Sequence, residues 1–395
     1  MQGDELSQWR PQKNGDWKYE SDVGSVAERD TCHGCSARAA ARQFKKPVYY
    51  KTSNNVWGMA TADFNHDGKL DLAFAEFLTG QVGIMLGNGD GAFQSPRYFS
   101  VPGALQLAVG DFNGDNILDL AVVEYGGTGH SALGVFLGDG KGNFKESATY
   151  ELGVESTSLV AADFDGDGYL DIAITNRFGY GKNGHEGAVL MFYGKGDGTL
   201  TSPSVYKLPG QPYGIAAGDL NRDHYPDLVV TEVSGGALAV LMNNGHGKFK
   251  HTKDYTLDGE PDVVTMADLD HNGTLDVVAC DAGTENIAVL LGNGDGTFGN
   301  VRFYSASKLG GGLDGLAIAD FNRDGNLDVA VVLENGGWPG LFYGKGDGTF
   351  EGVVAIKSIN DEGYATVTGN FNKDGEPDLV VGAVNKGLAV LINVR

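Results

Sequence analysis

Cysteine is almost absent from this chain of 395 residues, which has only Cys32, Cys35 and Cys280. Three thiols cannot form the disulfide framework that holds many small secreted domains together. Cys280 ends an apolar run, LDVVAC, and is expected to be a buried apolar residue. The fold must therefore depend on packing, hydrogen bonds or bound ions.

Long apolar runs and positive charge are also scarce. No run approaches the ~18 residues that span a bilayer, and the start, MQGDELSQWRPQK, lacks the apolar core of a secretion signal. The 29 Lys and Arg residues stand against 52 Asp and Glu, giving a formal net charge of −23. We therefore expect no membrane insertion and no nucleic-acid partner.

Much of the acidity lies in a nine-residue unit that occurs seven times. The first copy, DFNHDGKLD, runs from Asp63 to Asp71. The other copies are 48 to 56 residues apart and begin at Asp111, Asp163, Asp219, Asp268, Asp320 and Asn370. A period of this size is typical of propeller blades or solenoid coils.

Each repeat also contains short runs of β-branched or alternating residues, such as WGMATA, LDLAFAE and VGIMLG in the first repeat. Clusters of Gly and Asp separate these runs, which favours antiparallel strands over helices. Four strands per repeat predict an all-β fold, a seven-bladed β-propeller of four-stranded antiparallel blades over residues 44–395. Residues 1–43 fall outside the repeat and are expected to form an irregular N-terminal extension.

A Gly-rich turn, GNGDGAF at residues 87–93, follows the third strand. Equivalent turns end at Phe144, Leu200, Phe249, Phe298 and Phe350. The terminal residue is expected to pack between blades. The seventh repeat lacks this turn and a fourth strand, but residues 44–50, FKKPVYY, match residues 93–99, FQSPRYF. We predict that strand 44–50 completes the last blade, closes the ring and covers a sheet edge.

The nine-residue loops place oxygen atoms at alternate positions, numbered here from 1 to 9. Positions 1, 3, 5 and 9 are Asp or Asn, and the carbonyl of position 7 adds another oxygen. Calcium takes six to eight oxygens at about 2.3–2.6 Å, and a tightly curved loop can supply them. We predict up to seven Ca²⁺ sites, which would move the charge from −23 to −9. The candidate ligands are Asp63, Asn65, Asp67, Lys69, Asp71; Asp111, Asn113, Asp115, Ile117, Asp119; Asp163, Asp165, Asp167, Tyr169, Asp171; Asp219, Asn221, Asp223, Tyr225, Asp227; Asp268, Asp270, Asn272, Thr274, Asp276; Asp320, Asn322, Asp324, Asn326, Asp328; and Asn370, Asn372, Asp374, Glu376, Asp378.

The spacing within the loops excludes an EF-hand, because the position 12 glutamate of that motif would fall on Phe74. Ordinary turns, in which Asp and Asn bond their own backbone, remain an alternative. We expect such turns to have no use for an acid at position 9, so metal binding is favoured. The third loop has four carboxylates and should bind most tightly, whereas the loop beginning at Asn370 should be weakest or empty.

The loop pattern D-x-[ND]-x-[DN]-G-x-x-D and the turn G-x-G-D-G-x-F resemble the FG-GAP/VCBS repeat family, over residues 44–395. This family comprises seven-bladed propellers that include integrin α-subunit heads and many bacterial secreted proteins. The resemblance implies the fold, calcium binding and an extracellular or periplasmic location. It does not decide function, because the family includes adhesins, lectins and occasional lyases.

The N-terminal extension contains CHGC. Residues 5–43 resemble the tail of a cytochrome P460 domain, but Ser36 stands where covalent haem attachment needs a histidine. We interpret the segment as a remnant of a haem domain or a linker. A reduced or locally bridged Cys32–Cys35 pair is the alternative, and is favoured.

The face opposite the acidic loops is left for recognition. The residue six before each loop should ring the mouth of the central channel. These residues are Trp57, Leu105, Thr157, Tyr213, Asp262, Asp314 and Tyr364. The ends of the second strands carry Glu76, Glu124, Asn176, Glu232, Asp281 and Glu334, and the longest loops carry Tyr125, Phe178, Tyr180 and Trp338. Aromatic rings mixed with carboxylates suit sugars or cationic groups. Alternatively, the rings seal the loops and the acids are solvated.

Two functions are consistent with this face. The first is an extracytoplasmic binding or adhesion module for a glycan or protein, with Trp57, Tyr213, Tyr364, Tyr125, Trp338, Glu124 and Glu232 as ligand-binding residues. The second is a polysaccharide-degrading, lyase-like enzyme. His66, His224 and His271 fall inside the acidic loops and no nucleophile motif occurs, so binding is favoured and no catalytic residue is predicted.

Overall fold

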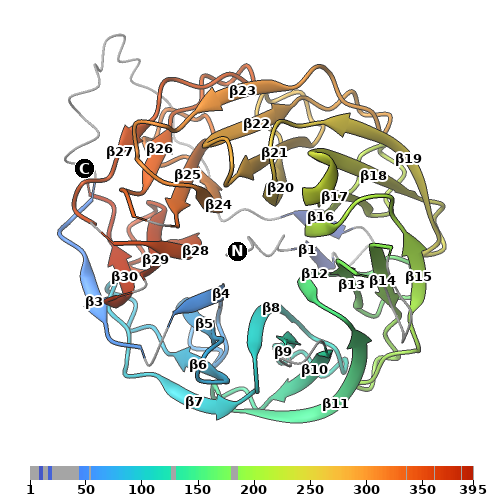
Figure 1. The fold of residues 1–395 in the computed structure, drawn as a ribbon. Coiled ribbons are helices and arrows are strands. Elements are labelled where there is room, and N and C mark those ends of the chain that lie inside the picture. The colour runs from blue at the N-terminus through green and yellow to red at the C-terminus, as the bar shows by residue number, and fades with distance from the viewer. Residues whose placement is uncertain are drawn as a thin grey trace.

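Seven four-stranded antiparallel sheets stand around a central opening in the computed structural model of the chain (Figure 1). The structure describes residues 9–11, 17–19, 44–52, 55–125, 130–178, 186–334, 336–359, 361–383 and 385–394. Cys32, Cys35 and Tyr180 lie outside these ranges. The predicted all-β, seven-bladed propeller is confirmed.

The strands of each blade follow one another from the centre outward (Figure 1). Blades one to three comprise β4 (Val56–Ala62), β5 (Asp71–Glu76), β6 (Gln81–Met85) and β7 (Arg97–Ser100); β8 (Ala104–Gly110), β9 (Asp119–Tyr125), β10 (Ser131–Gly138) and β11 (Phe144–Gly153); and β12 (Ser156–Ala162), β13 (Asp171–Asn176), β14 (Ala188–Phe192) and β15 (Ser204–Lys207).

Blades four to six comprise β16 (Pro212–Gly218), β17 (Asp227–Glu232), β18 (Ala237–Asn243) and β19 (Phe249–Thr256); β20 (Pro261–Ala267), β21 (Asp276–Asp281), β22 (Asn286–Leu290) and β23 (Arg302–Ser305); and β24 (Leu313–Ala319), β25 (Asp328–Leu333), β26 (Gly340–Phe342) and β27 (Val354–Ala355). A 3₁₀ turn, η2 (Val233–Gly235), follows β17. In a separate two-stranded sheet, β1 (Trp9–Pro11) pairs antiparallel with β2 (Trp17–Tyr19).

The seventh blade is made of both ends of the propeller. It comprises β28 (Gly363–Gly369), β29 (Asp378–Ala383) and β30 (Gly387–Leu391), with β3 (Val48–Tyr50) as the outer strand. In β3, Val48 lies opposite Val390 and Tyr50 opposite Leu388. The segment that the sequence predicts as strand 44–50 therefore pairs with β30 over residues 48–50.

The hydrophobic cores lie between blades and not within them. The second strands are buried on both faces, as in DLAFAE of β5, because a neighbouring sheet covers each side. The described residues form seven apolar clusters, and each combines side chains of two adjacent blades, the seventh and first blades included. A blade without both neighbours would leave apolar surface in water, so stability depends on ring closure.

Aromatic pairs join the outer strand of one blade to the Gly-rich turn of the next. The ring centroids of Tyr255 and Phe298 are 5.5 Å apart, and the Phe298 amide donates a hydrogen bond of 2.6 Å to the Tyr255 hydroxyl. Tyr50 and Phe93 repeat this arrangement at 6.0 Å, with an amide-to-hydroxyl distance of 2.9 Å. Tyr50 therefore joins the seventh blade to the first in the same way that Tyr255 joins the fourth blade to the fifth.

Candidate calcium loops and ligand face

Each acidic loop connects the first strand of a blade to the second. Two positions of the loop have the left-handed backbone conformation. The sequence predicts this at position 6, and Asn116 (φ 64°) and His224 (φ 72°) confirm it where glycine is missing. Position 4 is also left-handed, even at Arg222 (φ 64°) and Arg323 (φ 60°). Residue spacing gave no sign of this second bend, which points position 4 away from its own loop.

The acid at position 1 organises the bend in the first six loops. In the first loop, one Asp63 oxygen accepts the amide of Asp67 at 3.0 Å and the other accepts the amide of Gly68 at 2.7 Å. The same two bonds occur at Asp111, Asp163, Asp219, Asp268 and Asp320. In the seventh loop, the Oδ1 atom of Asn370 is buried without a hydrogen-bond partner. An amide has one accepting oxygen, so it cannot replace both bonds.

The acid at position 9 has a structural use in every loop. Each of the seven carboxylates is fully buried and accepts two backbone amides at 2.7–3.1 Å, one from position 2 and one from the end of the third strand or the residues just after it. Asp71, for example, binds the amides of Phe64 and Gly87. The expectation that a turn has no use for this acid is wrong, because the side chain joins the loop to the Gly-rich turn. Position 9 therefore does not by itself indicate a metal.

Replacement of Asp328 by Ala should separate this structural use from ion binding. The change leaves the amides of Phe321 and Gly344 buried without acceptors, so the free energy of unfolding should fall by roughly 2–6 kcal/mol without calcium. The control is Asp324→Ala in the same loop, where an exposed side chain is lost and water can replace it; we expect a loss below ~1 kcal/mol. Urea unfolding in a chelator measures both. Equal losses would contradict the assignment.

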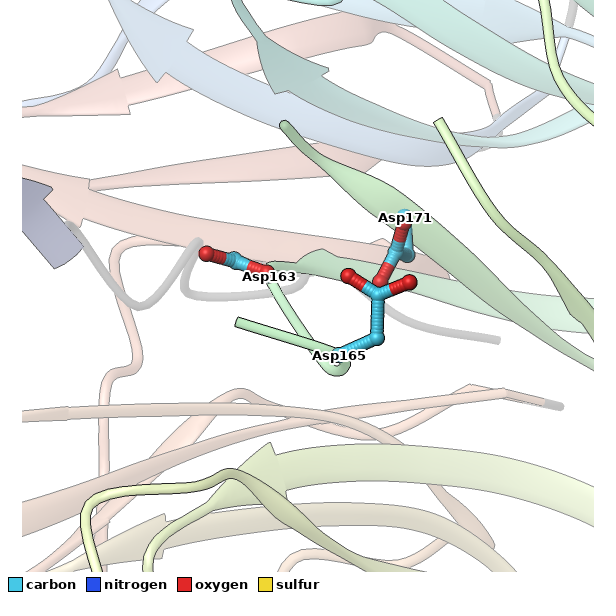
Figure 2. Close-up of side chains that lie close together, drawn as sticks. All are labelled: Asp163, Asp165 and Asp171. Carbon is cyan, nitrogen blue, oxygen red and sulfur yellow. The ribbon is translucent and has the colours of Figure 1, made fainter. Parts of the chain in front are cut away.

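Carboxylates converge most closely in the third and fifth loops. Oxygens of Asp163, Asp165 and Asp171 lie within 4.8 Å of one another (Figure 2), and those of Asp268, Asp270 and Asp276 do the same. Only these loops have Asp at position 3. Where Asn stands there, its amide group can donate to the acid at position 5, as in Asn113 to Asp115 at 3.0 Å. Counting carboxylates in the sequence favours the third loop but does not single out the fifth.

Electrostatics of the convergent acids suit a bound cation. Burial raises the pKa of Asp171 to about 7 against the opposing effect of two backbone amides, and Asp165 and Asp163 raise it further. Burial raises the pKa of Asp276 to about 6 in the same way. A hard divalent cation relieves the repulsion among such carboxylates and satisfies their free lone pairs. The donor sets of the third and fifth loops therefore fit calcium.

A β-bulge interrupts the first strand of every blade near its start, at the end opposite the acidic loop. In β4 the register shifts between Val56 and Gly58, so Trp57 is left unpaired. The other six first strands shift at the corresponding place. Bulges redirect side chains and often border functional sites. They occur at the seven residues that the sequence predicts around the channel mouth.

Aromatic side chains of three consecutive blades form a row on this opposite face. The ring centroids of Tyr364 and Trp57 are 5.0 Å apart and nearly parallel, those of Trp57 and Phe77 are 5.4 Å apart, and those of Phe77 and Tyr125 are 5.7 Å apart. Leu78, beside Phe77, is 64% exposed. We call Tyr364, Trp57, Phe77 and Tyr125 the aromatic row. It brings together three of the seven predicted ligand residues.

The other predicted aromatic residues stand apart from this row. Tyr213 belongs to blade four, where the Arg177 guanidinium lies 5.3 Å from its ring centre. Trp338 belongs to blade six, and the Lys357 ammonium lies 5.5 Å from its ring. A cation on an aromatic face covers part of it. These two rings are therefore less available to a ligand than the sequence suggested.

Two of the acids at the ends of the second strands, Glu232 and Glu124, lie against their own sheets. Glu232 accepts the Gly210 amide at 3.0 Å and is almost fully buried. Glu124 lies over the third strand of its blade, since a Cβ atom added to Gly134 would be 2.7 Å from its carboxylate. Burial, with Glu146 of the outer strand, raises its pKa to about 7. Glu124 and Glu232 therefore lie at the ends of the second strands, as expected, and their assignment as ligand-binding residues stays a prediction.

Fold and loops together define a propeller whose blades each carry an acidic loop between the first two strands. A sequence model of the FG-GAP-like repeat matches residues 63–122, 111–174, 180–230, 225–279 and 268–331. The chain belongs to the FG-GAP-like repeat family. Propellers of this family are generally interaction modules and are commonly extracellular. Within the described ranges, no helix has the length and apolar character needed to cross a bilayer.

Similarity to known proteins is partial or limited to the fold. Phosphatidylinositol-glycan-specific phospholipase D is 32% identical over 174 residues in Rattus norvegicus and 30% over 167 residues in Mus musculus. Each match covers 35% of this chain and 20% of the relative, so the chain spans a fifth of those proteins. BBS1N, crystallised with ARL6DN, has a TM-score of 0.59 at 13% identity, with 88% of this chain and 95% of that chain covered. An Agrocybe aegerita lectin that recognises non-reducing terminal N-acetylglucosamine has a TM-score of 0.55 at 20% identity, with 83% and 85% covered.

Proposed function

We propose that this chain is a calcium-stabilised binding module that works outside the cytoplasm and holds a protein or glycan ligand on the face opposite its acidic loops. Millimolar calcium in such compartments would fill sites of modest affinity. The aromatic row is the observation that carries the proposal. Its rings cover one another, so Leu78 and the ring edges offer the contact surface, and such apolar anchors dominate many interfaces.

The contrast between the two faces supports this assignment. On the loop face, the acid at position 9 accepts the same pair of backbone amides in all seven blades, which indicates a structural role. On the opposite face, the residue at the bulge varies among the blades and includes Trp, Leu, Thr, Tyr and Asp. Binding residues are commonly placed on variable segments that a rigid scaffold holds. The bulges and the aromatic row have this character.

Binding of the labelled protein to intact cells of its source tests the proposal. Leu78→Asp places a charge beside the aromatic row and should weaken binding by at least ~10-fold. Val205→Asp is the matched control, because Val205 is an exposed apolar residue of an outer strand, at 42%. Pretreating the cells with protease removes protein ligands, and periodate destroys glycan diols. Equal effects of the two substitutions would refute the proposed surface.

A polysaccharide-degrading enzyme is the second candidate. Asp262 and Asp314 stand in the bulges of adjacent blades, and burial raises their pKa to about 7 and about 6. Acids tuned in this way can serve as general acids or bases near neutral pH. Release of reducing sugar from any polysaccharide that binds, and its loss in Asp262→Asn, would favour this candidate. Binding without product supports the module.

A further inference from the structure

Position 4 of one acidic loop reaches the next loop around the ring. The Nη2 atom of Arg222, in the fourth loop, donates to the Asn272 carbonyl of the fifth loop at 3.2 Å. The Nη2 atom of Arg323, in the sixth loop, donates to the Asp374 carbonyl of the seventh at 3.4 Å. Both accepting carbonyls belong to position 5. The left-handed backbone at position 4 allows this reach, because it turns the side chain away from its own loop.

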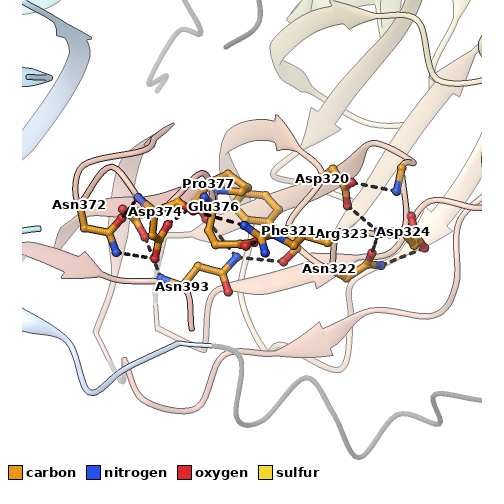
Figure 3. Close-up of polar contacts among 12 residues, drawn as sticks. Asp320, Phe321, Asn322, Arg323, Asp324, Asn372, Asp374, Glu376, Pro377 and Asn393 are labelled. Atoms are coloured by element: carbon orange, nitrogen blue, oxygen red, sulfur yellow. Dashed lines mark hydrogen bonds and ion pairs between the residues drawn. The ribbon is translucent and has the colours of Figure 1, made fainter. Parts of the chain in front are cut away.

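The two arginines differ in what they meet at position 7. Arg323 forms an ion pair with Glu376, whose side chain is 5% exposed while that of Arg323 is 44% exposed (Figure 3). In the fifth loop, position 7 is Thr274, whose hydroxyl donates to the Gly292 carbonyl of its own blade at 3.1 Å. A buried carboxylate is costly unless it is paired. Glu376 therefore needs a charged partner from blade six, whereas Thr274 bonds within its own blade and needs no partner from blade four.

The seventh loop fits a calcium ion poorly. Positions 1 and 3 are the neutral Asn370 and Asn372, and the amide of Asn372 donates to Asp374 at 2.7 Å. Asp374 and Asp378 are its two carboxylates at side-chain ligand positions, whereas three converge in the third and fifth loops. The Arg323 guanidinium beside this reduced donor set is neutralised by the Glu376 carboxylate. Negative charge that would attract a cation is therefore missing at positions 1 and 3.

We propose that the seventh loop binds no calcium and that the Arg323–Glu376 ion pair, reaching from blade six, holds this loop in place of an ion. A further link supports the same junction: the Asn393 side-chain amide donates to the Phe321 carbonyl of blade six at 2.9 Å (Figure 3). The blade that joins the two ends of the ring is therefore held by protein contacts that calcium depletion does not remove. The other acidic loops remain free to respond to calcium, as the proposed function requires.

Hydrogen exchange of the full chain in calcium and in chelator tests the proposal. Amides of residues 163–171 and 268–276 should exchange more slowly in calcium, and those of residues 370–378 should exchange equally in both. Arg323→Gln should speed exchange in residues 370–378 by at least ~10-fold in either condition, because it leaves a buried carboxylate unpaired. The matched Arg222→Gln should change exchange in residues 268–276 by less than ~3-fold, because no buried carboxylate loses its partner.

A double variant distinguishes the ion pair from a general structural defect. Arg323→Gln with Glu376→Gln removes both charges, so exchange should return to within ~3-fold of the original protein. If Arg323→Gln does not fold, the unmodified chain and the Glu376→Gln variant still test whether the seventh loop binds calcium. Neither should show calcium protection at residues 370–378. The proposal is overturned if calcium protects these residues as much as the third loop, or if the two arginine variants behave alike. If no loop responds to calcium, the calcium part of the proposed function fails. The effect of Arg323→Gln on exchange at residues 370–378 then still tests whether the ion pair holds the seventh loop.

Discussion

Removal of residues 1–50 should lower the melting temperature by at least ~10 °C, because three large aromatic side chains and an outer strand leave the propeller. Tyr49 and Tyr50 belong to β3, which pairs with β30. Phe44 packs edge-to-face on Phe321 of blade six, at 6.1 Å between ring centres. Tyr50 contacts Phe93 of blade one. The segment thus touches three consecutive blades at the junction of the ring.

A shorter truncation is the control for this experiment. Removal of residues 1–43 keeps β3 and its contacts, so the melting temperature should stay within ~2 °C of the full chain. Differential scanning calorimetry at one calcium concentration measures both variants. A large loss from the shorter truncation would place part of the propeller upstream of residue 44. Equal, small losses would show that ring closure does not need β3.

Calcium should raise the melting temperature by ~5–10 °C at pH 8, because each site at 100 times its Kd adds about 2.7 kcal/mol. The shift should shrink as the pH falls to 5.5. In the metal-free fold, burial raises the pKa of Asp328 to about 8, of Asp171 to about 7 and of Asp71 to about 6. These folded-state values exceed the unfolded-state value of 3.8, so the folded protein takes up protons.

The sign of the pH dependence follows from this uptake. Metal-free stability contributed by these groups is fully present below pH ~4 and is lost as the pH rises through 6 to 8. Calcium needs the ionised carboxylates, so its stabilisation grows over the same range. Thermal unfolding in calcium and in chelator, at several pH values, measures the difference. A calcium shift that is constant from pH 5.5 to 8 would contradict this view of the loops.

Two substitutions test whether calcium binds in the third and fifth loops. Asp165→Asn and Asp270→Asn together give the third and fifth loops the Asn that the other five loops carry at position 3. The calcium-induced shift should fall by about half or more, since two convergent triads lose one carboxylate each. Stability in chelator should change by less than ~1 kcal/mol, because both side chains are only half-buried and Asn keeps an oxygen that can accept the same backbone amide. An unchanged calcium shift would mean that the ions bind elsewhere.

The architecture could be predicted from the repeated sequence, because a propeller depends on local, periodic features. Strand length, alternation and turn glycines are properties of neighbouring residues, and seven copies gave seven blades. The match between residues 44–50 and 93–99 likewise located the outer strand of the last blade. Position 9 shows the limit of such patterns: an acid repeated in every loop suggested a ligand, whereas its two amide partners lie 7 and 15 to 23 residues away.

What only the tertiary structure decided are the contacts between blades and the direction of side chains on a curved sheet. A bulge in each first strand turns Trp57 and Tyr364 toward one another, although 307 residues separate them in the chain. Left-handed backbone at Arg323 sends its guanidinium to Glu376 in another blade, while Glu124 and Glu232 turn onto their own sheets. The directions of these side chains depend on strand register and on packing that many distant residues set together. Composition and spacing therefore determined which side chains are present, and the closed ring decided which of them meet.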